Sequence, residues 1–256
     1  MTGTEFLNPK SLKLLAALEA SRDRAFYRDH RTEIDELLLA PARHLVVEVG
    51  EILKKRIPAL VADPRVDRSI YRLFRDTRFS PDKRPYKGHL GLIWWEDRPA
   101  GKLGSPCFYF HLTGEGWLWS TGIYQFEPNI LKAWRLALAE PKTGESFLKI
   151  ADQIMALGLT FNPPELKRPP AGFENSATQD WARHKGLYTW SEASGHDRRL
   201  FGPKAAALIA EKLLSTENLF RFLSSLFAEK KPSADTSRSA RSVEISKRDF
   251  NYQEDF

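Results

Sequence analysis

The first sixty residues carry apolar side chains at the spacing of amphipathic helices. Asn8 and Pro9 match the cap and first turn of a helix, and leucines at intervals of three and four residues follow them. The same spacing predicts two more helices, over residues 31–38 and 41–57. Charged residues occupy most of the remaining positions, which is typical of helices with one face in solvent.

The middle of the chain changes to aromatic and β-branched residues in short runs. These runs predict four strands, over residues 69–76, 88–96, 106–113 and 116–124. Residues 113–116, Thr-Gly-Glu-Gly, predict a hairpin turn between the last two strands. Because the connections are short, we expect antiparallel pairing. Large aromatics here, including four of the seven tryptophans, are expected mainly in the core or on the floor of a groove.

Helical spacing returns after the predicted sheet. It predicts helices over residues 128–139, around 147–154, near Trp181, and over 203–214 and 217–227, with a strand near 187–190. The fold class is therefore α+β, with an antiparallel sheet of about four to five strands packed by N-terminal and C-terminal helices. We expect one domain over residues 1–228, followed by a polar tail over 229–256 that has no net charge and is predicted to be disordered.

Composition limits the class of protein only loosely. The chain has 256 residues, 42% of them hydrophobic, and a net charge of +6, which suits an anionic partner without requiring one. Cys107 is the only cysteine, so an internal disulfide is excluded; its apolar surroundings predict a small buried side chain. The sequence starts without a signal-peptide pattern and has no apolar run long enough to span a bilayer, so a cytoplasmic location is the default expectation.

Most of the excess positive charge lies in residues 65–89, which hold eight Arg or Lys and three Asp, a net charge of +5. In a strand over residues 69–76, alternation would put a guanidinium among apolar neighbours on each face. The two predicted faces are Ile70, Arg72 and Phe74, and Tyr71, Leu73 and Arg75. A guanidinium in such surroundings needs an anion or several acceptors, and arginine can grip a carboxylate or a phosphate with two parallel hydrogen bonds.

This basic segment also carries a family resemblance. Its pattern is Arg72-x-x-Arg75-Asp76-x-Arg78-Phe79-x-x-Asp82-Lys83-x-Pro85-Tyr86-Lys87, and it resembles the signature of DUF2461, a bacterial family of unknown function. Later landmarks agree over roughly residues 6–227, namely Tyr109-Phe-His-Leu112, Gly122, Arg135, Leu166-Lys-Arg-Pro-Pro-Ala-Gly-Phe173 and Lys185. Residues 24–27 depart from the family pattern. The resemblance implies a one-domain α+β fold and no established activity.

Three interpretations of the basic segment stay open. In the first, Arg72, Arg75 and Arg78 pair with Asp76, Asp82 and helix carboxylates, and so pin the loop to the sheet. In the second, basic residues from separate segments converge on a phosphate or carboxylate. That candidate anion site comprises Arg72, Arg75, Arg78, Lys83, Lys87, Lys167, Arg168 and Lys185, with Asp76, Asp82, Tyr86 and His89 as orienting or structural residues. The third is an extended nucleic-acid surface, which is weakly supported.

Familiar catalytic and metal-binding motifs are missing from the sequence. It contains no phosphate-binding glycine loop, dinucleotide fingerprint or nucleophile elbow. Its six histidines are scattered and no cysteine cluster accompanies them, so we expect no metal and no cofactor. Two hypotheses follow: an enzyme or binding protein that recognises a small phosphorylated or carboxylated anion, or a non-catalytic interaction protein for nucleic acid or a protein partner. Catalysis and oligomeric state are left open.

Overall fold

The computed structural model describes residues 6–78, 81–174, 176–191 and 195–228 of the chain. The predicted polar tail and Phe79 of the signature pattern lie outside these residues. A single domain over residues 1–228 stays a prediction.

Helices or helical turns form in each stretch where the apolar spacing predicts one, and two further short helices, over residues 26–29 and 101–104, are not predicted. The helices are α1 (Pro9–Ala20), α2 (Phe26–Asp29), α3 (Arg31–Ile34), α4 (Ala40–Lys54), α5 (Gly101–Gly104), α6 (Pro128–Ala139), α7 (Pro141–Ala156), α8 (Ala205–Leu214) and α9 (Glu217–Ser225), with a π-helical turn, η1 (Asp35–Leu39), and 3-10 turns, η2 (Trp181–Arg183) and η3 (Arg198–Phe201). The predicted cap is confirmed, because Asn8 Oδ1 accepts hydrogen bonds from the backbone N–H groups of Lys10 and Ser11 at 2.9 and 3.0 Å.

The two helices predicted over residues 31–38 and 41–57 form one continuous helical stretch. The π-helical turn joins α3 to α4, and Pro41 follows directly after it. Proline lacks an N–H group and crowds the turn before it, and the wider π turn accommodates both effects. The stretch ends at Lys54, three residues earlier than predicted.

In the part of the chain that the structure describes, six strands form one antiparallel sheet, so the prediction of four to five strands is too low. The strands are β1 (Leu60–Val61), β2 (His89–Glu96), β3 (Cys107–Thr113), β4 (Trp117–Ile123), β5 (Leu159–Phe161) and β6 (Leu187–Ser191), in the spatial order β1-β2-β3-β4-β6-β5. The α+β class and the antiparallel pairing are confirmed. The two added strands, β1 and β5, have only two and three residues, too few to show a period-two pattern.

The strand predicted over residues 69–76 is wrong. This segment is extended but makes only isolated bridges, first to β2 and then to its own continuation at Tyr86. Tyr71 N–H donates to Gly91 O at 3.0 Å, and Lys87 N–H donates to Leu73 O at 2.7 Å. Because the chain changes partner partway, the predicted alternation fails: the buried apolar side chains are Ile70 and Leu73, three residues apart.

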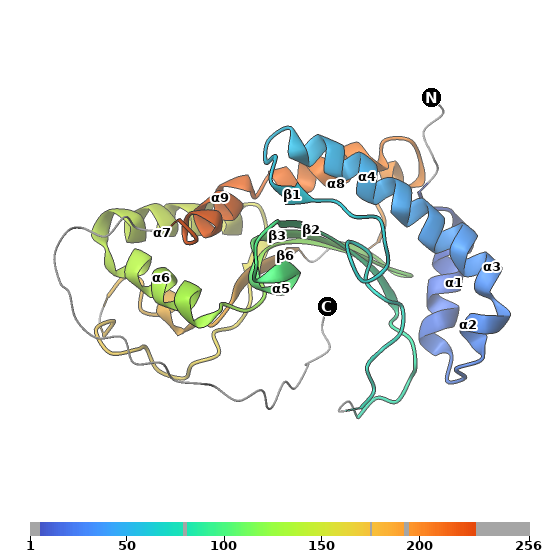
Figure 1. Cartoon of the computed structure of the whole chain (residues 1–256), viewed down its shortest axis with the longest axis horizontal. Coiled ribbons are helices and arrows are strands. Elements are labelled where there is room, and N and C mark those ends of the chain that lie inside the picture. The colour runs from blue at the N-terminus through green and yellow to red at the C-terminus, as the bar shows by residue number, and fades with distance from the viewer. Residues whose placement is uncertain (1–5, 79–80, 175, 192–194, 229–256) are drawn as a thin grey trace.

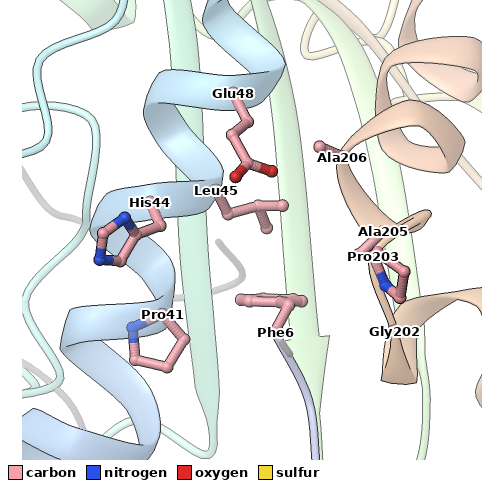
Figure 2. A pocket seen from close by; sticks show the side chains of 9 residues that line it. All are labelled: Phe6, Pro41, His44, Leu45, Glu48, Gly202, Pro203, Ala205 and Ala206. Atoms are coloured by element: carbon pink, nitrogen blue, oxygen red, sulfur yellow. The ribbon is translucent and has the colours of Figure 1, made fainter. Parts of the chain in front are cut away.

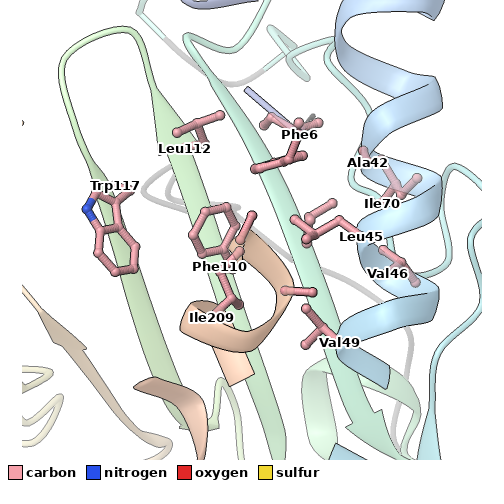
Figure 3. Close-up of a cluster of buried hydrophobic side chains, with 14 of the residues drawn as sticks. Phe6, Ala42, Leu45, Val46, Val49, Ile70, Phe110, Leu112, Trp117 and Ile209 are labelled. Carbon is pink, nitrogen blue, oxygen red and sulfur yellow. The ribbon is translucent and has the colours of Figure 1, made fainter. Parts of the chain in front are cut away.

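The two faces of the central strands have different coverings. Leu92 of β2 and Phe110 of β3 lie in the main hydrophobic cluster beneath α1, α4 and α8, as Figure 3 shows for Phe110, Leu45 and Ile209. The residues between these on the same strands point to the opposite face of the sheet and form a smaller hydrophobic cluster. Side chains from the extended segment, β1 and β4 pack against that cluster. Its members are Ile93, Trp95, Cys107 and Tyr109, with Val61, Tyr71 and Leu118 packed against them. We call the face that bears this cluster the open face.

The tryptophans predicted for the sheet are mostly core residues. Trp94 is fully buried and its indole N–H donates to Val46 O at 2.9 Å, while Trp95 and Trp117 are also buried. Trp119 is half-buried. A second cluster, centred on Trp134 and packed by α6, α7 and α9, extends the core beyond β6 (Figure 1).

Two glycines allow β6 and the end of β4 to approach closely. A Cβ atom on Gly122 would lie 2.3 Å from Tyr188 Cα, and one on Gly186 would lie 2.0 Å from Tyr124 O. No side chain fits at such distances, so the sequence must have glycine at both positions for Tyr124 and Tyr188 to come together.

We predict that Gly122→Ala destabilises the protein by about 1–3 kcal/mol, because the added methyl group would push β6 away from β4. Urea unfolding measures this change. Gly202→Ala is the matched control, since a Cβ there meets no atom within 4 Å, and its effect should stay within about 0.5 kcal/mol. Equal stability of the two variants would contradict the tight approach of the strands.

Candidate functional site

A pocket of about 650 Å³ lies on the open face of the sheet. This volume is within the range of about 300–1,000 Å³ that is usual for small-molecule sites. Its lining comes from β2, β3, β4 and β6, from α5 and from the extended segment that carries the arginines. The site is therefore assembled from segments that are far apart in the sequence.

The floor of the pocket is set by strand register. Ile93 of β2 pairs with Tyr109 of β3, which pairs with Ser120 of β4, so the three side chains point to the same face. Two residues further along, Cys107 lies opposite Gly122, which lies opposite Tyr188 of β6. The floor consequently spans four neighbouring strands.

Five cationic side chains and two carboxylates line the same pocket. The cations are Arg72, Arg75, Arg78, Lys87 and Lys102, and the carboxylates are Asp67 and Asp76. The lining therefore has an excess of positive charge, located on the segment before β2 and on α5.

The two most exposed arginines of the pocket lining form ion pairs with carboxylates close to them in sequence. Arg72 Nε lies 2.6 Å from Asp67 Oδ1, and the Arg78 guanidinium lies 2.6 Å from Asp76 Oδ2. The side chains of Arg72 and Arg78 are 68% and 76% exposed. Ion pairs this exposed add little to stability, so an incoming anion can compete for either guanidinium.

Arg75 has a different environment. Its side chain is 16% exposed and forms an ion pair with the carboxylate of Asp82. The Arg84 guanidinium lies 2.7 Å from the same carboxylate. The two guanidinium groups hold the pKa of Asp82 well below its usual range, with Arg84 as the larger cause. This shared carboxylate ties the two ends of the loop together, as the structural interpretation of the sequence predicts for part of the signature.

Asp76 is a weak base at neutral pH. Its hydrogen bonds from the Arg78 side chain and backbone lower its pKa to about 2. The carboxylate therefore stays ionised and is suited to orienting Arg78 rather than to accepting a proton.

The two lysines lie beside the ring of Tyr71. Lys102 Nζ is 4.4 Å from the ring centroid and donates to the backbone carbonyls of Asp67 and Arg68 at 2.9 and 3.1 Å. Lys87 Nζ is 5.5 Å from the same centroid. Burial lowers the pKa of Lys102. These contacts fix both ammonium groups at the pocket wall.

Tyr109 of the floor and its neighbour His111, which lies outside the lining, are both neutral at pH 7. Tyr109 Oη and His111 Nδ1 share a hydrogen bond of 3.3 Å, and the His111 ring stacks on His89 with centroids 4.0 Å apart. Its half-buried position and the nearby Lys87 lower the pKa of His111 to about 4. Burial raises the pKa of Cys107 to about 12, in agreement with the predicted small buried side chain rather than a nucleophile.

Some of the predicted site residues line this pocket and others do not. Those that line it are Arg72, Arg75, Arg78, Lys87 and Asp76. Those outside the lining are Lys83, Lys167, Arg168, Lys185, Asp82, Tyr86 and His89.

Three of the outside residues have clear local roles. Lys83 Nζ donates to Thr77 O at 2.8 Å. Tyr86 is fully buried, and its hydroxyl donates to Arg24 O at 2.8 Å, so it secures the loop to the N-terminal helices. Lys185 is exposed and its backbone N–H donates to the Glu165 carboxylate at 2.7 Å.

Sequence reasoning missed several lining residues. Lys102 lies in a four-residue helix and carries no motif, and Asp67 precedes the signature. Tyr124 and Tyr188 reach the pocket only through strand pairing, which spacing along the chain does not reveal. The sequence identifies Tyr109 only as part of a predicted strand that agrees with the family pattern, and not as a residue of the site.

A second, much smaller cavity of about 10 Å³ lies between α4 and the start of α8 (Figure 2). Phe6, His44, Glu48 and Pro203 border it. It has room for about one water molecule, so it is a packing gap and not a ligand site.

Two general searches cover only the residues that the structure describes. Among them, no group of three or more His, Cys, Asp or Glu side chains has the arrangement of a metal site. Within the same residues, every helix is too short or too polar to cross a bilayer.

We predict that native Cys107 reacts slowly with iodoacetamide and that its rate rises with pH between 7 and 9.5 without levelling off, because its pKa is raised to about 12 and the thiolate is the reactive form. Mass spectrometry follows the reaction. In urea, the same thiol should titrate near the usual value of about 8.5. A native thiol that titrates at or below that value would contradict the buried environment.

Comparison with known proteins supports the resemblance seen in the signature. Residues 10–222 match the model of a family described as "Conserved hypothetical protein (DUF2461)". No curated protein matches the sequence. Since the match spans most of the 256 residues, the chain belongs to the DUF2461 family, whose description names no activity.

Proposed function

We propose that the protein binds a small phosphorylated or carboxylated anion in the pocket on the open face. The observation that carries the proposal is the position of Arg72 and Arg78, whose exposed guanidinium groups border a pocket of about 650 Å³. Lys87 and Lys102 add two ammonium groups to the same lining.

The chemistry of these groups suits an oxyanion. A guanidinium donates two parallel hydrogen bonds to a phosphate or carboxylate, and an ammonium adds charge without fixing direction. The partners that Arg72 and Arg78 have in the structure, Asp67 and Asp76, are themselves about half exposed. When an anion displaces them, both carboxylates return to water at little cost.

The remaining predicted basic residues are not part of this proposal. Lys83, Lys167, Arg168 and Lys185 lie outside the lining, so the site is built from the segment before β2 and from α5. Arg75 is assigned mainly to holding the loop, because its side chain is largely buried against Asp82.

The nucleic-acid alternative has less support. Its motivation is aromatic residues beside basic ones, but Trp94, Trp95 and Trp117 are at most 7% exposed and cannot stack with bases. We therefore favour a small ligand.

We predict that phosphate raises the melting temperature of the protein, because a ligand that binds the folded state stabilises it. The comparison is with chloride at equal ionic strength. Arg78→Ala should weaken phosphate binding by about 10- to 100-fold, the effect of losing a charged hydrogen bond. Thermal melting and calorimetric titration measure the two effects.

Arg199→Ala is the matched control. Arg199 pairs with Asp197 two residues before it, as Arg78 does with Asp76, but it lies outside the pocket. Both variants should melt within a few degrees of the parent in chloride, and only Arg78→Ala should lose the response to phosphate. The proposal fails if no phosphate, sulfate or carboxylate stabilises the parent, or if the two variants respond alike.

A further inference from the structure

The pocket has two chemically different ends. The arginines belong to the segment that borders β2, where Tyr71 N–H bonds to Gly91 O. Tyr188 belongs to β6, three strand spacings beyond β2 in the sheet order. At about 4.8 Å per spacing, β2 and β6 alone are ~14 Å apart, so a group bound beside the arginines does not reach Tyr188.

The end away from the arginines is aromatic. The rings of Tyr124 and Tyr188 are stacked, with centroids 5.7 Å apart and planes inclined by 24°, and both side chains line the pocket half-buried. Both carboxylates of the lining, Asp67 and Asp76, lie on the arginine segment. Among the described lining residues, the tyrosine end therefore presents no charge of either sign.

Backbone contacts hold this tyrosine pair in place. Gly122 and Gly186 allow the approach of the two chain segments, and Asn162 Oδ1 accepts a hydrogen bond from Tyr188 N–H at 2.9 Å. Asn162 is itself buried, and its amide donates to Gly186 O at 3.2 Å. The rings are thus positioned before any ligand arrives, which reduces the entropy cost of stacking a planar group there.

The floor between the two ends matches a largely uncharged connecting group. Ile93 and Cys107 are apolar and buried, and Ser120 and Tyr109 each bring a hydroxyl group. Inorganic phosphate alone would leave most of the volume of about 650 Å³ unoccupied. A ligand that uses the whole pocket must carry its anion at one end and a flat ring at the other.

Resting on the anion site proposed above, we infer that the ligand is a phosphorylated aromatic compound of mononucleotide size, with its phosphate at Arg72 and Arg78 and its ring against Tyr124 and Tyr188. Nucleoside monophosphates have this chemistry, as do other planar heterocycles with a phosphate-bearing arm. Base-to-aromatic stacking predicts a gain in affinity of about 5- to 100-fold over the same phosphate without a ring.

Calorimetric titration of the full chain tests this inference. The probes are the four nucleoside 5′-monophosphates, ribose 5-phosphate, the four nucleosides, phenyl phosphate and inorganic phosphate. At least one ring-bearing phosphate should bind about 5- to 100-fold more tightly than ribose 5-phosphate. A preference for phenyl phosphate over every nucleotide would identify a smaller aromatic ligand of the same class.

Two variants of one residue separate stacking from folding. Tyr188→Phe keeps the ring and should keep the preference for ring-bearing phosphates. Tyr188→Leu removes the ring but retains apolar bulk, and should lose that preference while binding inorganic phosphate as the parent does. Arg78→Ala should weaken all phosphates alike, because it acts at the other end.

The outcomes distinguish the two proposals. If inorganic phosphate binds and the ring adds less than twofold, the present inference fails and the anion site stands. If no phosphate of any kind binds, both fail together. If Tyr188→Leu keeps the full preference, the ring is bound elsewhere and the assignment to the tyrosine pair is overturned.

Discussion

The pairing of β2 with β3 and β4 is the constraint on which the pocket depends. Side chains alternate along a strand, so placing Leu92 and Phe110 beneath the helices sends Ile93 and Tyr109 to the opposite face. A shift of register by one residue would exchange the two sets and bury the floor of the pocket in the main core. The same apolar burial that stabilises the fold therefore selects the side chains of the open face.

The basic segment needs a means of holding like charges together. Local carboxylates provide it, since Asp67 pairs with Arg72, Asp76 with Arg78, and Asp82 with Arg75. The pairs at the rim are exposed and readily exchanged, whereas Arg75 is largely buried and fixed. One signature thus combines a largely buried ion pair with guanidinium groups that remain accessible to solvent.

Local signals in the sequence predicted most of the helices and the central strands. Asn8 as a cap and the spacing of the leucines after it predict α1 from local sequence alone. The segment over residues 69–76 shows where such reasoning stops. Its aromatic and β-branched composition favours a strand, but the edge of β2 is shared with β1 and the segment turns away to pair with Tyr86. Which segment pairs with a sheet edge depends on tertiary packing, and the local spacing of apolar residues does not reveal it.

The candidate site was predictable only on its cationic side. Four basic residues of the signature line the pocket, and their concentration in the sequence pointed to them. The aromatic side depends on contacts between distant segments, because Tyr188 reaches the floor only where Gly122 lets β6 close on β4. The two sides are also held by different means. Exposed ion pairs leave the guanidinium groups adjustable, while close backbone packing fixes the tyrosines, so the pocket has one adaptable end and one preformed end.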